Sequence, residues 1–279
     1  METTATSGYN TRCEMQVKSG GSWKRTKGSW IKINDEWHKF GGGAGAAVID
    51  EASSSSTDVV FETLTNPFLD DRNFLLVRFE TVGTYTLSVS DAGLAEILLI
   101  GGGGNGSSYG APDNTSAGGA GGGDAASVVS GKFFLEEGDS TIFVGDRGGQ
   151  YSTITSPSNN ILYARGGRPQ GSTSNAGGWG STTTNTTKSG GYGTQSDITG
   201  EMLPYAGGGG AGSNYAGYGN NAGAGRDGGG NGRSGTAGGN GYPATTFGSG
   251  GGGAAWRFPD QGGGGGAGMR GVAYIRVEI

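Results

Sequence analysis

Three glycines follow an apolar run and have the spacing of a dinucleotide-binding turn. Gly101, Gly103 and Gly106 satisfy G-x-G-x-x-G, a motif in which the third glycine opens a helix whose N-terminus holds a pyrophosphate. Pro112 and a run of glycines follow instead, and both oppose a helix. Asp124 lies near the spacing of a ribose-binding acid, but the helical crossover is missing. The sequence therefore predicts no nucleotide site.

Other residues that could do chemistry are sparse. His38 is the only histidine, which excludes a histidine-based metal cluster and disfavours a histidine-dependent triad. Cys13 has no cysteine to pair with, and we interpret it as an ordinary thiol. Asp227 lies in a single short match to a calcium-binding glycine–aspartate repeat, whereas Asp139 and Asp146 fit turns. We predict no catalytic residue, no metal site and no cofactor, and therefore no enzyme.

Glycine dominates the composition. Of the 65 glycines, ten lie in the first 100 residues and 55 in the remaining 179, against a usual level of roughly 7%. They are clustered, and there are only 7 prolines, so a collagen helix is excluded. Disorder is the alternative for such a composition. The 5 Trp, 11 Tyr and 10 Phe, together with flanking apolar segments, favour an ordered chain.

Charge and hydropathy exclude further classes. The formal net charge is −5 and charged residues make up 15% of the chain, whereas a nucleic-acid surface needs a basic patch. The first ten residues lack a basic start and an apolar core, so we expect no signal peptide. No apolar run approaches the ~20 residues that span a bilayer. We predict no nucleic-acid partner.

The N-terminal region contains a short repeat. Val17–Lys24 aligns with Ile31–His38 at an offset of 14 residues, and each copy has a strand, a two-residue turn and a Trp. Isolated hairpins are marginal in water. We therefore expect residues 1–45 to dock on a partner, although packing of these Trp on the chain's own core is the alternative. The expected anchors are Trp23, Trp30, Trp37 and Phe40.

The rest of the chain alternates between linker, strands and glycine clusters. Residues 41–57 have the composition of a linker, and we assign 46–76 to linker and connecting strands. Runs of alternating or continuous apolar residues predict strands at 59–64, 74–79, 84–90, 96–100, 127–135, 141–144, 161–164 and 272–277. The run at 96–100 is expected to be buried on both faces. No stretch has a helical period, so the sequence predicts a mainly β protein with almost no α-helix.

The glycines have a structural explanation. Polyglycine adopts an extended helix with three residues per turn and no internal hydrogen bonds. Without side chains, several such helices approach closely and bond to one another through their amides, and a Cβ at a packed position would push neighbours apart. We expect a β-sandwich-like framework around a lattice of polyglycine-II helices.

Several segments together resemble the glycine-rich domain of phage tail proteins. GTYTLSV at 83–89 and AEILLIGGGG at 95–104 are similar to its opening strands, "GTYTFTVP" and "VLVVGGGG". Residues 130–145 resemble its middle hairpin, and 262–277 its closing glycine cluster and terminal strand. The resemblance covers roughly residues 77–279. At positions 90–91, Ser-Asp replaces the usual proline-containing turn. The N-terminal repeat resembles the paired "VKxGGxWK" hairpins of phage tail proteins.

The resemblance implies a glycine-rich adhesin domain at 77–279, located on the virion in a tail fibre or tail tip. Its loops would contact a host surface glycan or outer-membrane protein, and the N-terminal module would bind other tail or fibre proteins. The resemblance leaves open whether the protein assembles as a homotrimer or is present as a single copy. Aromatic–polar loops at 213–221, 240–247 and 254–261 suit recognition. The receptor-binding candidates are Asn214, Tyr215, Tyr218, Tyr242, Trp256, Arg257 and Phe258.

Other interpretations accompany this one. Trp256 and Phe258 would alternatively cap the ends of the lattice against water. The whole protein would alternatively be a structural fibre, collar or decoration component that binds no receptor. A third class is an extracellular glycine-rich scaffold, such as an ice-binding or matrix protein.

Overall fold

The computed structural model describes most of the chain from residue 45 onward. The described residues are 45–54, 58–65, 73–108, 120–169, 189–213, 222–234, 239–255 and 263–279, together with the backbone of 16–19, 22–25, 30–33 and 36–39. Every regular element in these ranges is a β-strand, which confirms the prediction of a mainly β protein. No described segment forms a helix with the length and apolar character needed to cross a membrane.

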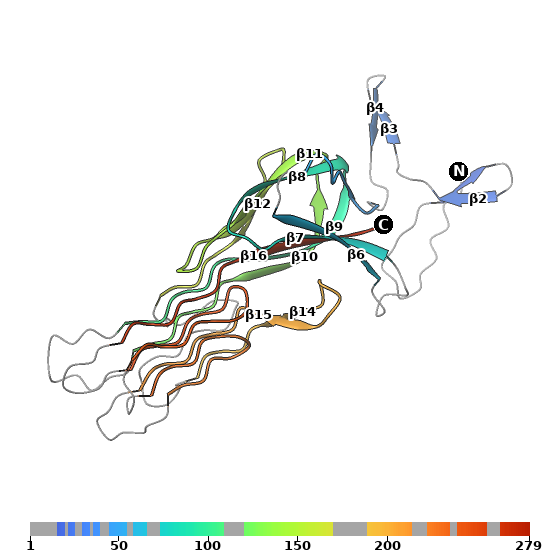
Figure 1. The fold of residues 1–279 in the computed structure, drawn as a ribbon. Helices are drawn as coiled ribbons and strands as arrows, with labels where there is room; N and C mark the ends of the chain where they lie inside the picture. The colour runs from blue at the N-terminus through green and yellow to red at the C-terminus, as the bar shows by residue number, and fades with distance from the viewer. Residues whose placement is uncertain are drawn as a thin grey trace.

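The first large sheet has the C-terminal strand at its centre (Figure 1). Its order is β10-β9-β16-β7-β6, and all pairs are antiparallel. Ile275 on β16 lies opposite Ile97 on one side and Val77 on the other. The strands are β6 (Val59–Thr65), β7 (Asn73–Phe79), β9 (Gly93–Ile100), β10 (Val128–Leu135) and β16 (Val272–Glu278).

The second large sheet has the order β13-β12-β11-β8-β5 and is also antiparallel. Its strands are β5 (Val48–Ile49), β8 (Gly83–Asp91), β11 (Gly138–Val144), β12 (Ser152–Thr155) and β13 (Ile161–Ala164). The short strand β5 lies in a stretch with linker composition, yet Ala47 and Ile49 are buried. These apolar side chains reach the core because β5 pairs with β8.

The two large sheets share one hydrophobic core. Alternate residues of their strands point into it, including Val77 from β7, Leu87 from β8 and Ile142 from β11. Each fully buried side chain of this size stabilises the fold by roughly 1.5–3 kcal/mol.

A second apolar cluster lies on the other face of the first sheet. There Leu98 and Ile100 pack near Ile198 and Tyr205, which belong to the region of the small hairpin β14 (Thr194–Ser196) and β15 (Leu203–Tyr205). On the same strand, Ile97 and Leu99 face the shared core. The expected burial of the 96–100 run on both faces is therefore confirmed.

The N-terminal repeat forms two separate hairpins. β1 (Gln16–Ser19) pairs with β2 (Ser22–Arg25), and β3 (Trp30–Ile33) pairs with β4 (Glu36–Lys39). In both hairpins the register leaves two residues between the strands, as the sequence predicts.

Strand β12 is missing from the sequence prediction. Its sequence STIT has a single strongly apolar side chain, Ile154, so no clear period is visible. The buried Ser152 explains its place: its Oγ donates to the carbonyl of Ile100 at 2.8 Å and accepts from the N–H of Gly145 at 3.0 Å. These two bonds of Ser152 add to the burial of Ile154 in the shared core and to the pairing of β12 with β11 and β13.

Candidate functional site

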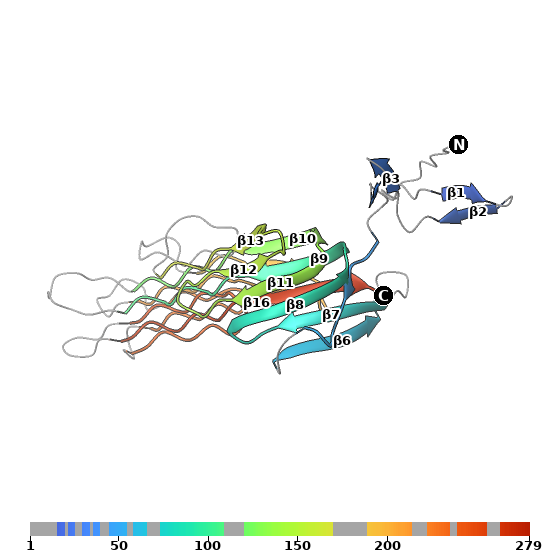
Figure 2. The same ribbon diagram turned by 90° about the horizontal axis from the view of Figure 1, so that it is seen from above.

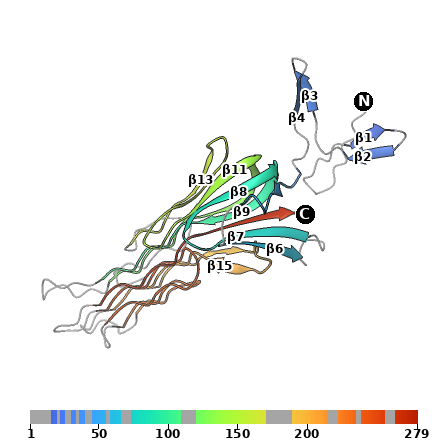
Figure 3. The same ribbon diagram turned by 45° about the horizontal axis from the view of Figure 1, so that its top comes forward.

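The glycine-rich segments run side by side away from the sheets (Figures 1 and 2). We call the following described residues the glycine block: 101–108, 120–127, 165–168, 189–193, 206–213, 222–234, 239–255 and 263–271. Strand β9 runs directly into it, and strands β10 and β16 follow directly from it. The C-terminus lies beyond β16, on the side of the sheets away from the block (Figure 3).

Hydrogen bonds in the block link different segments at intervals of three residues. The N–H groups of Gly101, Gly104 and Ser107 donate to the carbonyls of Ser127, Asp124 and Gly121, at 3.5, 2.9 and 2.9 Å. Between them, Gly103 and Gly106 donate to a different segment, at Met269 and Gly266. The glycines that match the dinucleotide motif thus use their N–H groups to bind neighbouring segments.

The segment 248–255 lies among the others and repeats the same pattern. Every third residue faces the same neighbour: Gly251 and Ala254 donate to Gly104 and Ser107, whereas Gly250 and Gly253 donate to Gly207 and Gly210. Further bonds join 248–255 to segments 120–127, 228–234, 239–244 and 263–271. It is therefore an interior segment of the block.

Close approach of backbones explains why glycine is needed there. A Cβ on Gly252 would overlap the carbonyl oxygen of Asn231, and a Cβ on Gly253 would overlap that of Ala120. These obstacles are main-chain atoms, which cannot move aside as a flexible side chain can. Overpacking of an interior usually costs about 1–3 kcal/mol.

Side-chain oxygens complete the bonding at several positions of the block. Asn105 Oδ1 accepts from the N–H of Gly268 at 2.9 Å. Asn231 Oδ1 accepts from Gly225 at 2.8 Å, and Asn240 Oδ1 from Gly264 at 2.7 Å. These amide oxygens take the place of a main-chain carbonyl and satisfy an N–H that a further segment would otherwise bind. We call these three residues the capping asparagines.

One end of the block gathers the borders of several stretches outside the described residues. Ala254 donates to Ser107, and Ala120 donates to Ala254, both at 3.2 Å. Gly212 donates to Ala120, Ser213 to Arg233, and Ala255 to Gly239. Residues that border 109–119, 214–221, 235–238 and 256–262 therefore lie together, at the end of the block remote from the sheets (Figure 1). We call this the distal end.

Tyr242 is the receptor-binding candidate whose structure is described. The residue is 47% exposed, and its hydroxyl accepts from Arg233 Nη1 at 2.5 Å. The Arg233 guanidinium lies 5.5 Å from the ring centroid, within the range of a cation–π interaction. The pair forms an accessible aromatic and cationic surface three residues from Gly239, at the distal end.

For the other candidates the structure describes either the backbone alone or nothing. Asn214, Tyr215, Tyr218, Trp256, Arg257, Phe258 and Phe40 lie outside the described residues. Trp23, Trp30 and Trp37 lie on β2, β3 and β4, where only backbone pairing is described. Their proposed roles in binding stay predictions.

The stretch 240–247 is not a single loop at the distal end. Its last residue, Phe247, packs near the sheets, with its ring centroid 6.4 Å from that of Tyr274. The site predicted from the sequence lacks Arg233, because the sequence does not reveal that this residue faces Tyr242. Only the register between neighbouring glycine-rich segments brings the two together.

A metal ion would need a cluster of acidic, His or Cys side chains. Among the described residues, no group of three or more His, Cys, Asp or Glu side chains could bind one. Asp227 instead occupies a turn with φ of 43°, and its Oδ2 accepts from the N–H of Gly193 at 2.8 Å.

Comparison with known proteins adds no relative: no family model, curated protein or solved structure matches the chain. The functional proposal therefore rests on the geometry of the glycine block and its distal end. The likeness to phage tail proteins stays a resemblance of sequence segments.

Proposed function

We propose that the protein is a virion adhesin of a phage tail fibre or tail tip, which presents receptor-binding loops at the distal end of its glycine block. The observation that carries this proposal is the convergence of chain segments at that end, on a base of tightly bonded backbone. Loops that start and finish on such a base can vary in sequence without changing the scaffold.

We interpret the glycine block as a lattice of polyglycine-II helices. Three features support this interpretation: the three-residue interval of the hydrogen bonds, their formation between segments, and the main-chain obstacles to any Cβ. A polyglycine-II helix has three residues per turn and no internal hydrogen bonds, so its amide groups point to different neighbours in turn. Such a block would be rigid although it buries few side chains, because its segments hold one another through their amide groups.

The two large sheets would form a β-sandwich-like framework that anchors the lattice. They share one core, and three strands of the first sheet are continuous with glycine-rich segments. Because the first lattice residues are covalently joined to buried strands such as β9, the framework would fix where each polyglycine segment begins.

Recognition would use the stretches 109–119, 214–221 and 256–262, together with the Tyr242–Arg233 pair. Tyr and Trp provide a large contact area at low entropic cost, while Asn, Ser and Gly adapt their hydrogen bonding. These properties suit a host surface glycan or the loops of an outer-membrane protein. Residues 1–45 would attach the protein to other tail or fibre proteins through the Trp-bearing hairpins.

The proposal is tested by binding of the fluorescently labelled full-length protein to a panel of bacterial strains. An adhesin binds a subset of strains with saturation, and excess unlabelled protein competes for the sites. The same protein should block infection of those strains by the phage that carries it. Binding to none of the strains that the phage infects would favour the structural fibre, collar or decoration component.

A further inference from the structure

Each capping asparagine is followed by glycine. The sequence contains three Asn-Gly pairs, and they are Asn105-Gly106, Asn231-Gly232 and Asn240-Gly241. All three belong to the glycine block, and no Asn-Gly pair lies elsewhere in the chain. The coincidence has a geometric origin, since an outward-facing asparagine is followed by a position where the block admits only glycine.

An Asn-Gly pair is chemically labile. The main-chain nitrogen of the glycine loses its proton and attacks Cγ of the asparagine, so that a nitrogen–carbon bond forms. The bond from Cγ to Nδ2 breaks, and ammonia leaves with the added proton. Water then opens the cyclic imide at either carbonyl and gives aspartate or isoaspartate. Glycine accelerates this reaction because it has no side chain to hinder the attack.

Both reacting groups are engaged in the folded block. At Asn105, the amide oxygen accepts from Gly268 at 2.9 Å, while the N–H of Gly106 donates to Gly266 at 2.9 Å. At Asn231, the oxygen accepts from Gly225 at 2.8 Å, while the N–H of Gly232 donates to Gly223 at 2.9 Å.

In the third pair, Asn240-Gly241, the side chain and the glycine N–H both form hydrogen bonds with the same residue, Gly264. Asn240 Oδ1 accepts from the N–H of Gly264 at 2.7 Å, and the N–H of Gly241 donates to the carbonyl of Gly264 at 3.0 Å. In every pair the side chain and the attacking nitrogen are therefore bound to neighbouring backbone. For the attack to occur, the glycine N–H must first give up its hydrogen bond to the neighbouring carbonyl. The asparagine side chain must also rotate away from the N–H that it caps.

We propose that the three Asn-Gly pairs are modification sites whose deamidation is controlled by opening of the glycine block. In the closed block the pairs are protected, and each local opening exposes them to the reaction. Isoaspartate inserts an extra methylene into the main chain, so the three-residue interval is lost beyond it. An opened segment that has reacted in this way does not regain its bonds.

The first experiment compares the folded protein with the same chain in concentrated denaturant, at one mildly alkaline pH and temperature. Samples taken over time are digested, and deamidation at each pair is followed by mass spectrometry. We expect all three pairs to react at least about tenfold more slowly when folded, as follows from a local opening free energy of about 1.4 kcal/mol or more. Equal rates in the two states would overturn the proposal.

The second experiment removes one cap and keeps the others. Gly264→Pro deletes the N–H that binds Asn240 Oδ1, while the fixed φ of proline suits an extended helix. A Cβ at this position meets nothing closer than Asn240 Oδ1 at 3.4 Å, and the ring Cδ, which takes the place of the amide hydrogen, pushes this same flexible side chain out of its cap. Deamidation at Asn240 should rise several-fold, with Asn105 and Asn231 unchanged as internal controls. An unchanged rate at Asn240 would show that the cap contributes no protection.

Discussion

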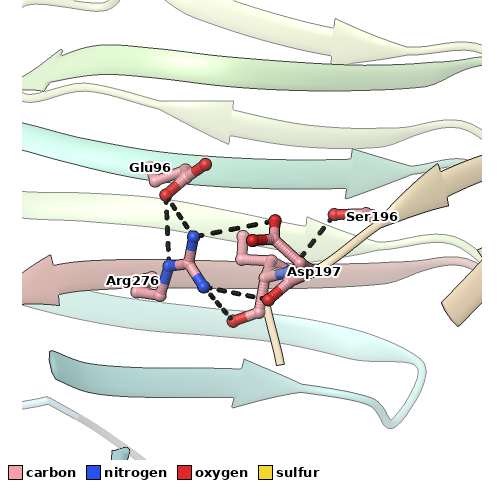
Figure 4. A network of polar contacts seen from close by, with 5 residues as sticks. Glu96, Ser196, Asp197 and Arg276 are labelled. Atoms are coloured by element: carbon pink, nitrogen blue, oxygen red, sulfur yellow. Dashed lines mark hydrogen bonds and ion pairs between the residues drawn. The ribbon is translucent and has the colours of Figure 1, made fainter. Parts of the chain in front are cut away.

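Arg276 Nη2 lies 2.6 Å from Glu96 Oε2, across the pairing of β16 with β9 (Figure 4). Arg276 is only 3% exposed, and its Nη1 donates to the carbonyl of Asp197 at 2.9 Å. The guanidinium thus joins the first sheet to the turn between β14 and β15. Because β15 leads into the segment 206–213, this contact fixes the start of one glycine-rich segment relative to the framework.

Glu96→Ala should lower the free energy of unfolding by about 3 kcal/mol, because it leaves a buried guanidinium without its nearest carboxylate. The matched control is Glu62→Ala, which removes the equally short but more exposed pair of Glu62 with Arg78. Exposed ion pairs contribute about 0–1 kcal/mol. Urea unfolding of both variants checks the difference, and equal losses would contradict it.

Gly252→Ala should destabilise the protein by at least about 1–3 kcal/mol, because its Cβ would overlap the Asn231 carbonyl oxygen inside the block. Gly45→Ala is the control, since a Cβ there meets nothing within 4 Å. This control should leave stability within about 0.5 kcal/mol of the wild type, or raise it slightly. Thermal unfolding measures both, and a tolerated Gly252→Ala would argue against close-packed backbones.

The sequence predicts most strands because their apolar patterns have a local cause. Burial of Ile97 and Leu98 on opposite faces of β9 follows directly from a continuous apolar run. The central position of β16 in the first sheet could not be predicted from the sequence. Its partners β9 and β7 lie far away along the chain, and no local pattern indicates which strands pair. The arrangement of the glycine block is harder still to predict, because its glycines are identical and nothing in the sequence specifies which segments form hydrogen bonds with each other. For that reason Tyr242 was predicted and its partner Arg233 was not.

Stability should fall above about pH 10, the ordinary pKa of tyrosine. Burial raises the pKa of Tyr274, and the hydrogen bond from its hydroxyl to Glu80 Oε1 raises it further. The folded state therefore favours the protonated hydroxyl. Its stabilising contribution is complete below the unfolded pKa and is lost as the pH rises toward the folded pKa.

The Tyr274→Phe variant has no ionisable hydroxyl at this position. Its free energy of unfolding should therefore decline less steeply in alkali than that of the wild type. Some decline should persist, because burial also raises the pKa of Tyr85 and Tyr205. Unfolding curves at several pH values from neutral to alkaline measure the slope for each protein. An unchanged slope in Tyr274→Phe would assign the alkaline transition to other groups.

Tyr242→Ala should weaken binding to susceptible cells by about tenfold, as loss of an interface aromatic commonly does. Tyr192→Ala is the matched control. Tyr192 is 69% exposed and also has an arginine over its ring, with Arg226 at 5.0 Å from the centroid, but it lies beside β14 rather than at the distal end. Binding of both variants is measured by flow cytometry. Equal effects of the two substitutions would contradict a role of the distal end in recognition.

Attachment to the virion and binding to cells should be separable by substitution. Replacing Trp23, Trp30 and Trp37 by Ala should abolish incorporation into particles, because aromatic side chains dominate well-packed interfaces, and should leave binding of the purified protein to cells intact. Tyr242→Ala should do the reverse, with normal incorporation and weaker adsorption. Particle incorporation is measured by immunoblot of purified virions from complemented infections. If the Trp variant still enters particles, the hairpins serve another purpose; if it also loses cell binding or fails to fold, the Trp side chains pack against the protein's own core.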